Sequence, residues 1–198
     1  GYSSPHYCKI DGIGQILLMC KTGIISVLPH DGSLLWEYEW PVGDRILQPV
    51  LLDGGNLLVS SGSSKGMRHL KITVGTEGWN IEELWSAPWL KSTFNDLVVH
   101  KNHAYGFSGP FLECVDMAQG ERVWKGGRYG GQLILMTDQD LLLVLTEKGE
   151  IALVQADPAA FKELGKIPVI EGKTWNHPVL MGDLLLVRNS QEMVALRL

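Results

Sequence analysis

Residues 23–36 read GIISVLPHDGSLLW, and residues 111–124 read FLECVDMAQGERVW. Each stretch holds an apolar run, a turn that contains glycine, and a second run that ends in tryptophan. A longer version of the same pattern runs from Gly78 to Trp85, and Leu164 stands at the matching place of a further unit. Because glycine lets the chain reverse, the two runs of each stretch are predicted to pair as antiparallel strands.

A second repeat opens each unit: a polar residue is followed by a turn and by a run rich in Leu and Val. It returns about every forty to fifty residues along the chain. We call its five members the repeat polar residues; they are Ser4, Gln48, Asp96, Gln132 and His177. A period of this length, with four short strands in each unit, is typical of β-propeller blades. We therefore predict an all-β propeller chain with about five four-stranded antiparallel blades.

The two repeats divide the chain into a single propeller domain. Its predicted blades span approximately residues 1–42, 43–90, 91–127, 128–172 and 173–198. The last blade contains only three predicted strands, and the first has no spare strand before it. Because an open propeller exposes an unpaired strand edge, we expect a partial, C-terminal propeller. Further blades or a second chain would complete it.

The composition favours a packed domain and argues against nucleic-acid-binding and helical membrane-spanning proteins. The chain has 198 residues, is 45% hydrophobic and carries a formal net charge of -5. This content supports a packed core, and the absence of a basic stripe argues against nucleic-acid binding. No apolar run is long enough for a membrane-spanning helix. The three cysteines, Cys8, Cys20 and Cys114, lack metal-type spacing and are predicted to be small buried side chains. The alternative is a disulfide between Cys8 and Cys20, if they lie on neighbouring strands of one blade.

Three tryptophans recur on the predicted fourth strands. Trp36, Trp85 and Trp124 each follow the turn glycine of their unit. A large ring at one repeated place can fill the space between twisted sheets. We therefore predict that these residues pack between blades and do not bind a ligand.

The repeat polar residues are the candidate ligand site. First strands line the central channel of a propeller, so polar side chains that recur there could bind a ligand on the axis. The plainer interpretation is that any channel wall must be solvated, and the sequence leaves both interpretations open.

Two other motifs resemble functional sites but have simpler explanations. His100 and His103 lie three residues apart across a predicted tight turn, where histidine and asparagine are common, and we expect them to be solvated. The glycine-rich segment 126–131 lacks the Lys-Ser/Thr ending of a phosphate-binding loop, and no helix follows it. We predict that it connects two blades. No catalytic, cofactor-binding or metal-binding residue is predicted.

The repeated motif resembles the pyrroloquinoline-quinone-like repeat, and the resemblance covers essentially the whole chain. Its best matches are residues 23–36 and 111–124. This resemblance implies a ring of about seven or eight blades. The repeat occurs in quinoprotein alcohol dehydrogenases and in the propeller lipoprotein of the bacterial outer-membrane assembly machinery. It therefore implies a bacterial protein of the periplasm or cell envelope.

The resemblance implies two alternative functions. The dehydrogenases carry an adjacent cysteine pair, a calcium ion bound by Glu, Asn and Asp, and an aspartate base on the axis. This chain has no adjacent cysteine pair, although Asn95, Asp96 and Asn176 offer oxygen ligands. We expect a non-catalytic scaffold without a cofactor, whose partner is a protein, a ligand or the remaining blades. The alternative is a quinoprotein-like oxidoreductase that binds pyrroloquinoline quinone and calcium on the axis.

Overall fold

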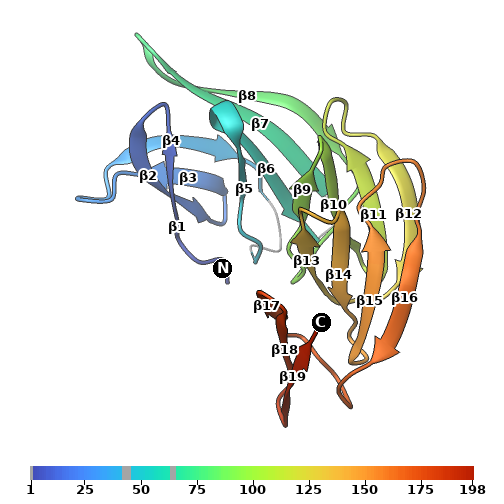
Figure 1. Cartoon of the computed structure of the whole chain (residues 1–198). Helices are drawn as coiled ribbons and strands as arrows, with labels where there is room; N and C mark the ends of the chain where they lie inside the picture. Colours follow the sequence, from blue (N-terminus) through green and yellow to red (C-terminus); the bar gives the residue numbers. More distant parts are fainter. Residues whose placement is uncertain (1, 42–45, 63–65) are drawn as a thin grey trace. The chain divides into compact units, whose positions relative to one another are not determined.

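The computed structural model describes residues 2–41, 46–62 and 66–198. These residues form strands in five antiparallel sheets, each built from consecutive strands of the chain (Figure 1). Four sheets have four strands and the last has three. The predicted all-β fold of antiparallel propeller blades is confirmed. The chain divides into two compact units, Gly1–Phe94 and Asn95–Leu198, which are described separately.

The first unit holds two sheets. The strands of the first sheet are β1 (His6–Ile10), β2 (Ile13–Met19), β3 (Gly23–Val27) and β4 (Leu34–Glu39). Those of the second are β5 (Val50–Leu52), β6 (Asn56–Ser61), β7 (Gly66–Gly75) and β8 (Gly78–Ala87), with a 3-10 turn at Asp53–Gly55.

The second unit holds three sheets. The strands of the third sheet are β9 (Val98–His100), β10 (His103–Ser108), β11 (Phe111–Asp116) and β12 (Arg122–Arg128). Those of the fourth are β13 (Gln132–Met136), β14 (Leu141–Leu145), β15 (Glu150–Gln155) and β16 (Glu163–Pro168). The fifth sheet consists of β17 (Val179–Met181), β18 (Leu184–Arg188) and β19 (Met193–Arg197).

Tight turns join the first two strands of several sheets. Asp11 and Gly12 connect β1 to β2, and Lys101 and Asn102 connect β9 to β10, all with positive φ. Two successive residues with positive φ make a type I′ turn, whose twist matches that of the paired strands. Asp11, Gly12 and Asn102 are of the residue types that reach this conformation at low cost, whereas Lys101 is not.

The apolar runs of inner strands are buried on both faces. Along β14, Leu142 and Val144 belong to a core shared with the third sheet, while Leu143 and Leu145 belong to a core shared with the fifth. Successive side chains of a strand point to opposite faces, so an unbroken apolar run fits a sheet that is covered on both sides. The fourth sheet therefore joins the two cores of the second unit.

Every fourth strand has a register shift close to the repeated aromatic position. Trp36 pairs with Ser26, Trp85 with His69 and Trp124 with Cys114, each directly after an extra residue in its strand. In the fourth sheet the extra residue is Leu164, and the residue that pairs with Leu153 is Gly165. The expectation that Leu164 corresponds to the tryptophans is therefore wrong. A β-bulge adds one residue to one strand, and spacing in the sequence does not reveal it.

Candidate functional site

All five repeat polar residues lie at the entry to a first strand. Ser4, Gln48, Asp96 and His177 each precede their strand by two residues, and Gln132 is the first residue of β13. They fall in both units: Ser4 and Gln48 in the first, the other three in the second. That all five line one channel remains a prediction.

In the first unit, the entry segments of the two sheets are tied together by the residues in front of the repeat positions. The Ser3 hydroxyl donates a hydrogen bond to the Leu47 carbonyl at 3.0 Å. Ser4 itself is exposed. The Oε1 atom of Gln48 is buried and meets no hydrogen-bond partner among the described residues. The structure thus does not join these two candidate side chains to each other.

The second unit repeats this link between the entries of the third and fourth sheets. The side-chain amide of Asn95 donates a hydrogen bond from Nδ2 to the Gly131 carbonyl. Asn95 and Gly131 again directly precede two of the repeat polar residues. Gln132 then donates from Nε2 to the Trp175 carbonyl at 3.2 Å, which ties the fourth sheet to the segment that enters the fifth. Part of the polar pattern at the strand entries therefore serves to join neighbouring blades.

Two of the candidate residues meet directly. His177 Nε2 lies 3.2 Å from Asp96 Oδ2, and both side chains are about half exposed. This contact links the entry to the third sheet with the entry to the fifth. It leaves an imidazole and a carboxylate at the surface, next to the Gln132 contact.

An exposed tryptophan lies two residues before His177 in the chain. The Trp175 side chain is 68% exposed, yet its indole Nε1 donates to Glu147 Oε1 at 2.8 Å. The Lys173 ammonium lies 3.4 Å from the same carboxylate oxygen and 5.1 Å from the centre of the Trp175 ring. The hydrogen bond from Trp175, and then Lys173, lower the pKa of Glu147. We call Glu147, Lys173 and Trp175 the Trp175 cluster.

The backbone beneath the Trp175 cluster is anchored. Thr174 is buried, its amide donates to the Glu147 carbonyl at 3.1 Å, and its hydroxyl donates to the Thr146 carbonyl at 2.6 Å. The Glu147 amide in turn donates to the Tyr129 carbonyl at 3.1 Å, so the third, fourth and fifth sheets are linked in series. These bonds hold the exposed indole in one place.

The Trp175 cluster was not predicted from the sequence. Trp175 comes three residues after Gly172, whereas four residues separate Gly32 from Trp36 and Gly120 from Trp124. It also lies in no fourth strand, so the repeat gave it no packing role. Its position two residues before His177 was the available signal. A tryptophan beside a polar strand entry lies outside the apolar runs that build the core, and this could have marked it as a surface residue.

The histidine turn differs from its expected form. His100 is not a solvated turn residue: its side chain is 12% exposed, and its Nε2 lies 2.5 Å from Asp140 Oδ1. Lys101 Nζ contacts the other oxygen of the same carboxylate at 2.6 Å. Hydrogen bonds from Lys101, and then from His100, lower the pKa of Asp140. This cluster joins the β9–β10 turn to the β13–β14 turn, so we interpret it as structural.

The glycine-rich segment begins inside a strand. Gly126 and Gly127 belong to β12, and only residues 129–131 connect the third sheet to the fourth. A Cβ atom at Gly126 would lie 2.2 Å from the ring of Phe161, so glycine leaves room for a side chain from the next sheet. The conformation of Gly127, with a φ of 56°, also favours glycine.

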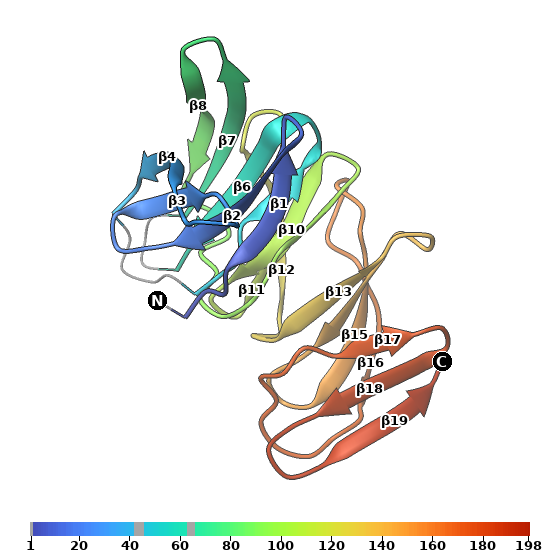
Figure 2. The ribbon, with the colours of Figure 1, turned by 90° about the vertical axis from the view of Figure 1, so that its left-hand side faces the viewer.

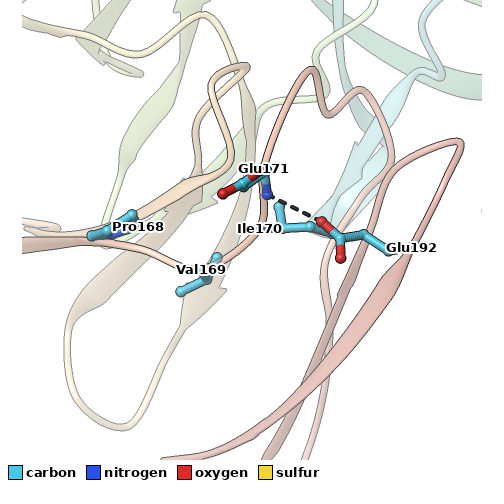
Figure 3. Close-up of a pocket in the computed structure, with 5 residues that line it drawn as sticks. All are labelled: Pro168, Val169, Ile170, Glu171 and Glu192. Carbon is cyan, nitrogen blue, oxygen red and sulfur yellow. Dashed lines mark hydrogen bonds between the residues drawn. The ribbon is translucent and has the colours of Figure 1, made fainter.

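One open hollow of about 390 Å³ lies along the linker from β16 to β17 (Figure 3). Its lining consists of residues 168–171 and Glu192, and the Glu171 amide donates to Glu192 Oε1 at 3.2 Å. These residues include carboxylates but no nucleophile with a base beside it. Within the described ranges, no group of three His, Cys, Asp or Glu side chains is placed to hold a metal ion. The predicted lack of a cofactor is not tested by these observations.

The fold has relatives among solved structures. No family model and no curated protein matches the sequence. The computationally designed Ika8 protein has a TM-score of 0.58, 11% identity, and coverage of 99% of this chain and 70% of its own. A chain of the mitotic checkpoint complex has a TM-score of 0.51, 11% identity, and coverage of 98% and 75%. At such identities these two similarities show the fold alone.

BamB from Moraxella catarrhalis is also similar, with a TM-score of 0.49 and 12% identity over 91% of this chain and 68% of its own. A similarity of this size supports no argument about function. No helix in the part of the chain that the structure describes is long and apolar enough to cross a membrane.

Proposed function

We propose that this chain is a non-catalytic scaffold that binds a protein partner, and that the partner contacts the second unit at Trp175. The observation that carries the proposal is the fixed and exposed indole of the Trp175 cluster. Exposed tryptophans are frequent binding hot spots, because one ring supplies a large contact area together with a polar N–H group. A side chain that is already held in place loses little conformational entropy on binding.

The surroundings of Trp175 suit a protein surface. Lys173 and Glu147 flank the ring with opposite charges, and Asp96 and His177 add a second such pair. An apolar centre with a polar rim is the usual anatomy of a protein–protein interface. By resemblance of the repeat, we assign this scaffold to a quinone-type propeller of the bacterial cell envelope.

Photocrosslinking tests the proposal. The photoreactive analogue benzoylphenylalanine replaces Trp175 in one variant and Ile167 in a control, and both are irradiated in the native cells. Ile167 is 59% exposed on β16 of the same unit. We expect a discrete adduct with one protein at position 175 and none at position 167. No adduct at position 175, or the same adducts at both positions, would contradict the proposal.

A second step uses the partner identified in this way. Trp175→Ser should reduce its affinity at least about tenfold, the loss of a hot-spot side chain, while Ile167→Ser leaves it unchanged. Titration of the purified chain with pyrroloquinoline quinone and calcium tests the alternative. Saturable changes in quinone absorbance, lost on Asp96→Ala, would favour the oxidoreductase.

A further inference from the structure

The first sheet has one face in the core and one open face. Alternate residues such as Cys8, Leu17 and Ile24 belong to the core of the first unit. Cross-strand register assigns a second set of residues to the opposite face. We call this set the first-sheet face; it consists of Tyr7, Ile16, Leu18, Ile25, Val27 and Leu34. Tyr7 is 59% exposed and Leu34 is similarly exposed, so this apolar face is not fully covered.

The fifth sheet has the same asymmetry. Leu185 and Val187 are buried against the fourth sheet, and Leu180, Val194 and Leu196 pack beside them. Figure 2 shows its three strands side by side. We call the opposite set the fifth-sheet face; it consists of Val179, Met181, Leu184, Leu186, Met193 and Ala195. Met181 is 70% exposed, and Val179 and Met193 are also exposed. A sheet face with several exposed apolar side chains next to one another often marks a contact site.

The net charges of the two faces are of opposite sign. Glu37 pairs with Ile25 and Glu39 with Gly23, so both carboxylates lie on the first-sheet face. Lys9, which pairs with Gly14, adds one positive charge there. On the fifth-sheet face, Arg188 pairs with Met193, and Arg197 pairs with Leu184. Arg197 also contacts Asp183 at 2.6 Å, but both of these side chains are mostly exposed.

We propose that the first-sheet face of one copy of this chain docks on the fifth-sheet face of a second copy. Such a contact would stack two apolar sheet faces, as the cores inside each unit already do. It would also bring the carboxylates of Glu37 and Glu39 toward the guanidinium groups of Arg188 and Arg197. Complementary charges at the rim of an apolar contact select the partner and its orientation. Because the two faces differ, the contact is head-to-tail.

Charge reversal with mixing tests this self-association in the full chain. One variant carries Glu37→Arg and Glu39→Arg, and the other carries Arg188→Glu and Arg197→Glu. In sedimentation velocity the original chain should associate as its concentration rises to about 100 µM, a range that detects weak contacts. Each variant alone should associate about tenfold more weakly, since two attractive pairs become repulsive. An equimolar mixture should recover association, because each altered face then meets one of opposite charge.

The controls separate this contact from general charge effects. Glu77→Arg and Lys162→Glu change exposed charges away from both faces and should leave association unchanged. A chain that carries all four charge reversals should associate with itself, because its two faces again have opposite charges. Circular dichroism verifies that each variant is folded. A chain that stays monomeric at about 100 µM, association that neither variant weakens, or a loss that mixing does not restore would each overturn the proposal. These outcomes are independent of the crosslinking at Trp175.

Discussion

Trp36 in the first unit and Trp124 in the second occupy the same register position but make different contacts. The ring of Trp36 is only 4% exposed, and its Nε1 donates to the buried Gln15 Oε1 at 2.7 Å. The Ser26 hydroxyl donates to the same oxygen at 2.6 Å. All three residues belong to the first sheet, so the polar atom of Trp36 is satisfied without help from another blade.

Trp124 depends on the neighbouring sheet. Its Nε1 donates to the Asp157 carbonyl at 2.8 Å, and its ring makes an edge contact with Phe161 at a centroid distance of 5.6 Å. Both partners lie in the connection between β15 and β16. Both rings pack in a core that two sheets share, but the N–H group of Trp36 finds its acceptor within its own blade and that of Trp124 finds it in the next one.

Among the substitutions considered, Trp36→Ala should destabilise the fold most. Removal of this buried ring should lower the free energy of unfolding by about 3–5 kcal/mol, since it leaves a cavity and removes the indole donor from Gln15. Urea denaturation of the purified chain measures the change. Trp175→Ala, which removes an exposed ring, is the control and should change stability by no more than about 0.5 kcal/mol. Equal losses in the two variants would contradict the difference in burial.

Trp124→Ala should cost about 3 kcal/mol, the lower end of the range for large aromatic residues, because this ring is only partly buried. A double-mutant cycle with Phe161→Ala should show a coupling of about 0.5–1.5 kcal/mol, as expected for an aromatic pair. The same cycle between Trp36 and Phe161 should be additive. Unchanged stability of Trp124→Ala with loss of partner binding would show that this residue belongs to a binding site.

Gly126→Ala should destabilise the junction by about 1–3 kcal/mol, the usual cost of overpacking. The added methyl group would overlap the Phe161 ring, so the ring must move away from Trp124. Phe161→Ala in the same chain should recover part of this loss, which urea denaturation can measure. A loss that Phe161→Ala does not reduce would indicate backbone strain at residue 126.

The smallest expected effect is the pH dependence of stability that His69 causes beside Trp85. His69 packs edge-on against Trp85 at 5.2 Å, and burial, followed by the charge of Lys71, lowers its pKa below 6.5. Between the folded and unfolded pKa values the unfolded chain binds more protons. Stability should therefore fall as the pH drops through about 6.5 and be fully present above it. His69→Phe should remove this dependence in urea denaturation between pH 5 and pH 8, and an unchanged dependence would contradict it.

The sequence predicted the fold well because period and alternation are local properties. The run Leu142–Leu145 by itself indicates a strand covered on both faces. In the structure its alternate residues lie in two different cores. The bulges were not predictable, since an added residue in β16 changes register without changing composition, and Leu164 was therefore taken for Gly165. Of the candidate site, the contact between Asp96 and His177 follows the repeat, whereas Trp175 lies outside it.

The serial hydrogen bonds of Glu147 and Thr174 have a consequence for hydrogen exchange. Their amide protons bond to carbonyls of a neighbouring sheet's segment and not to a partner within their own ladder. Such protons exchange with solvent when adjacent blades move apart, even if each blade keeps its own ladder. Exchange rates at these two amides would therefore report the opening of the junctions on either side of the fourth blade. Amides inside β14 would report the melting of that blade itself.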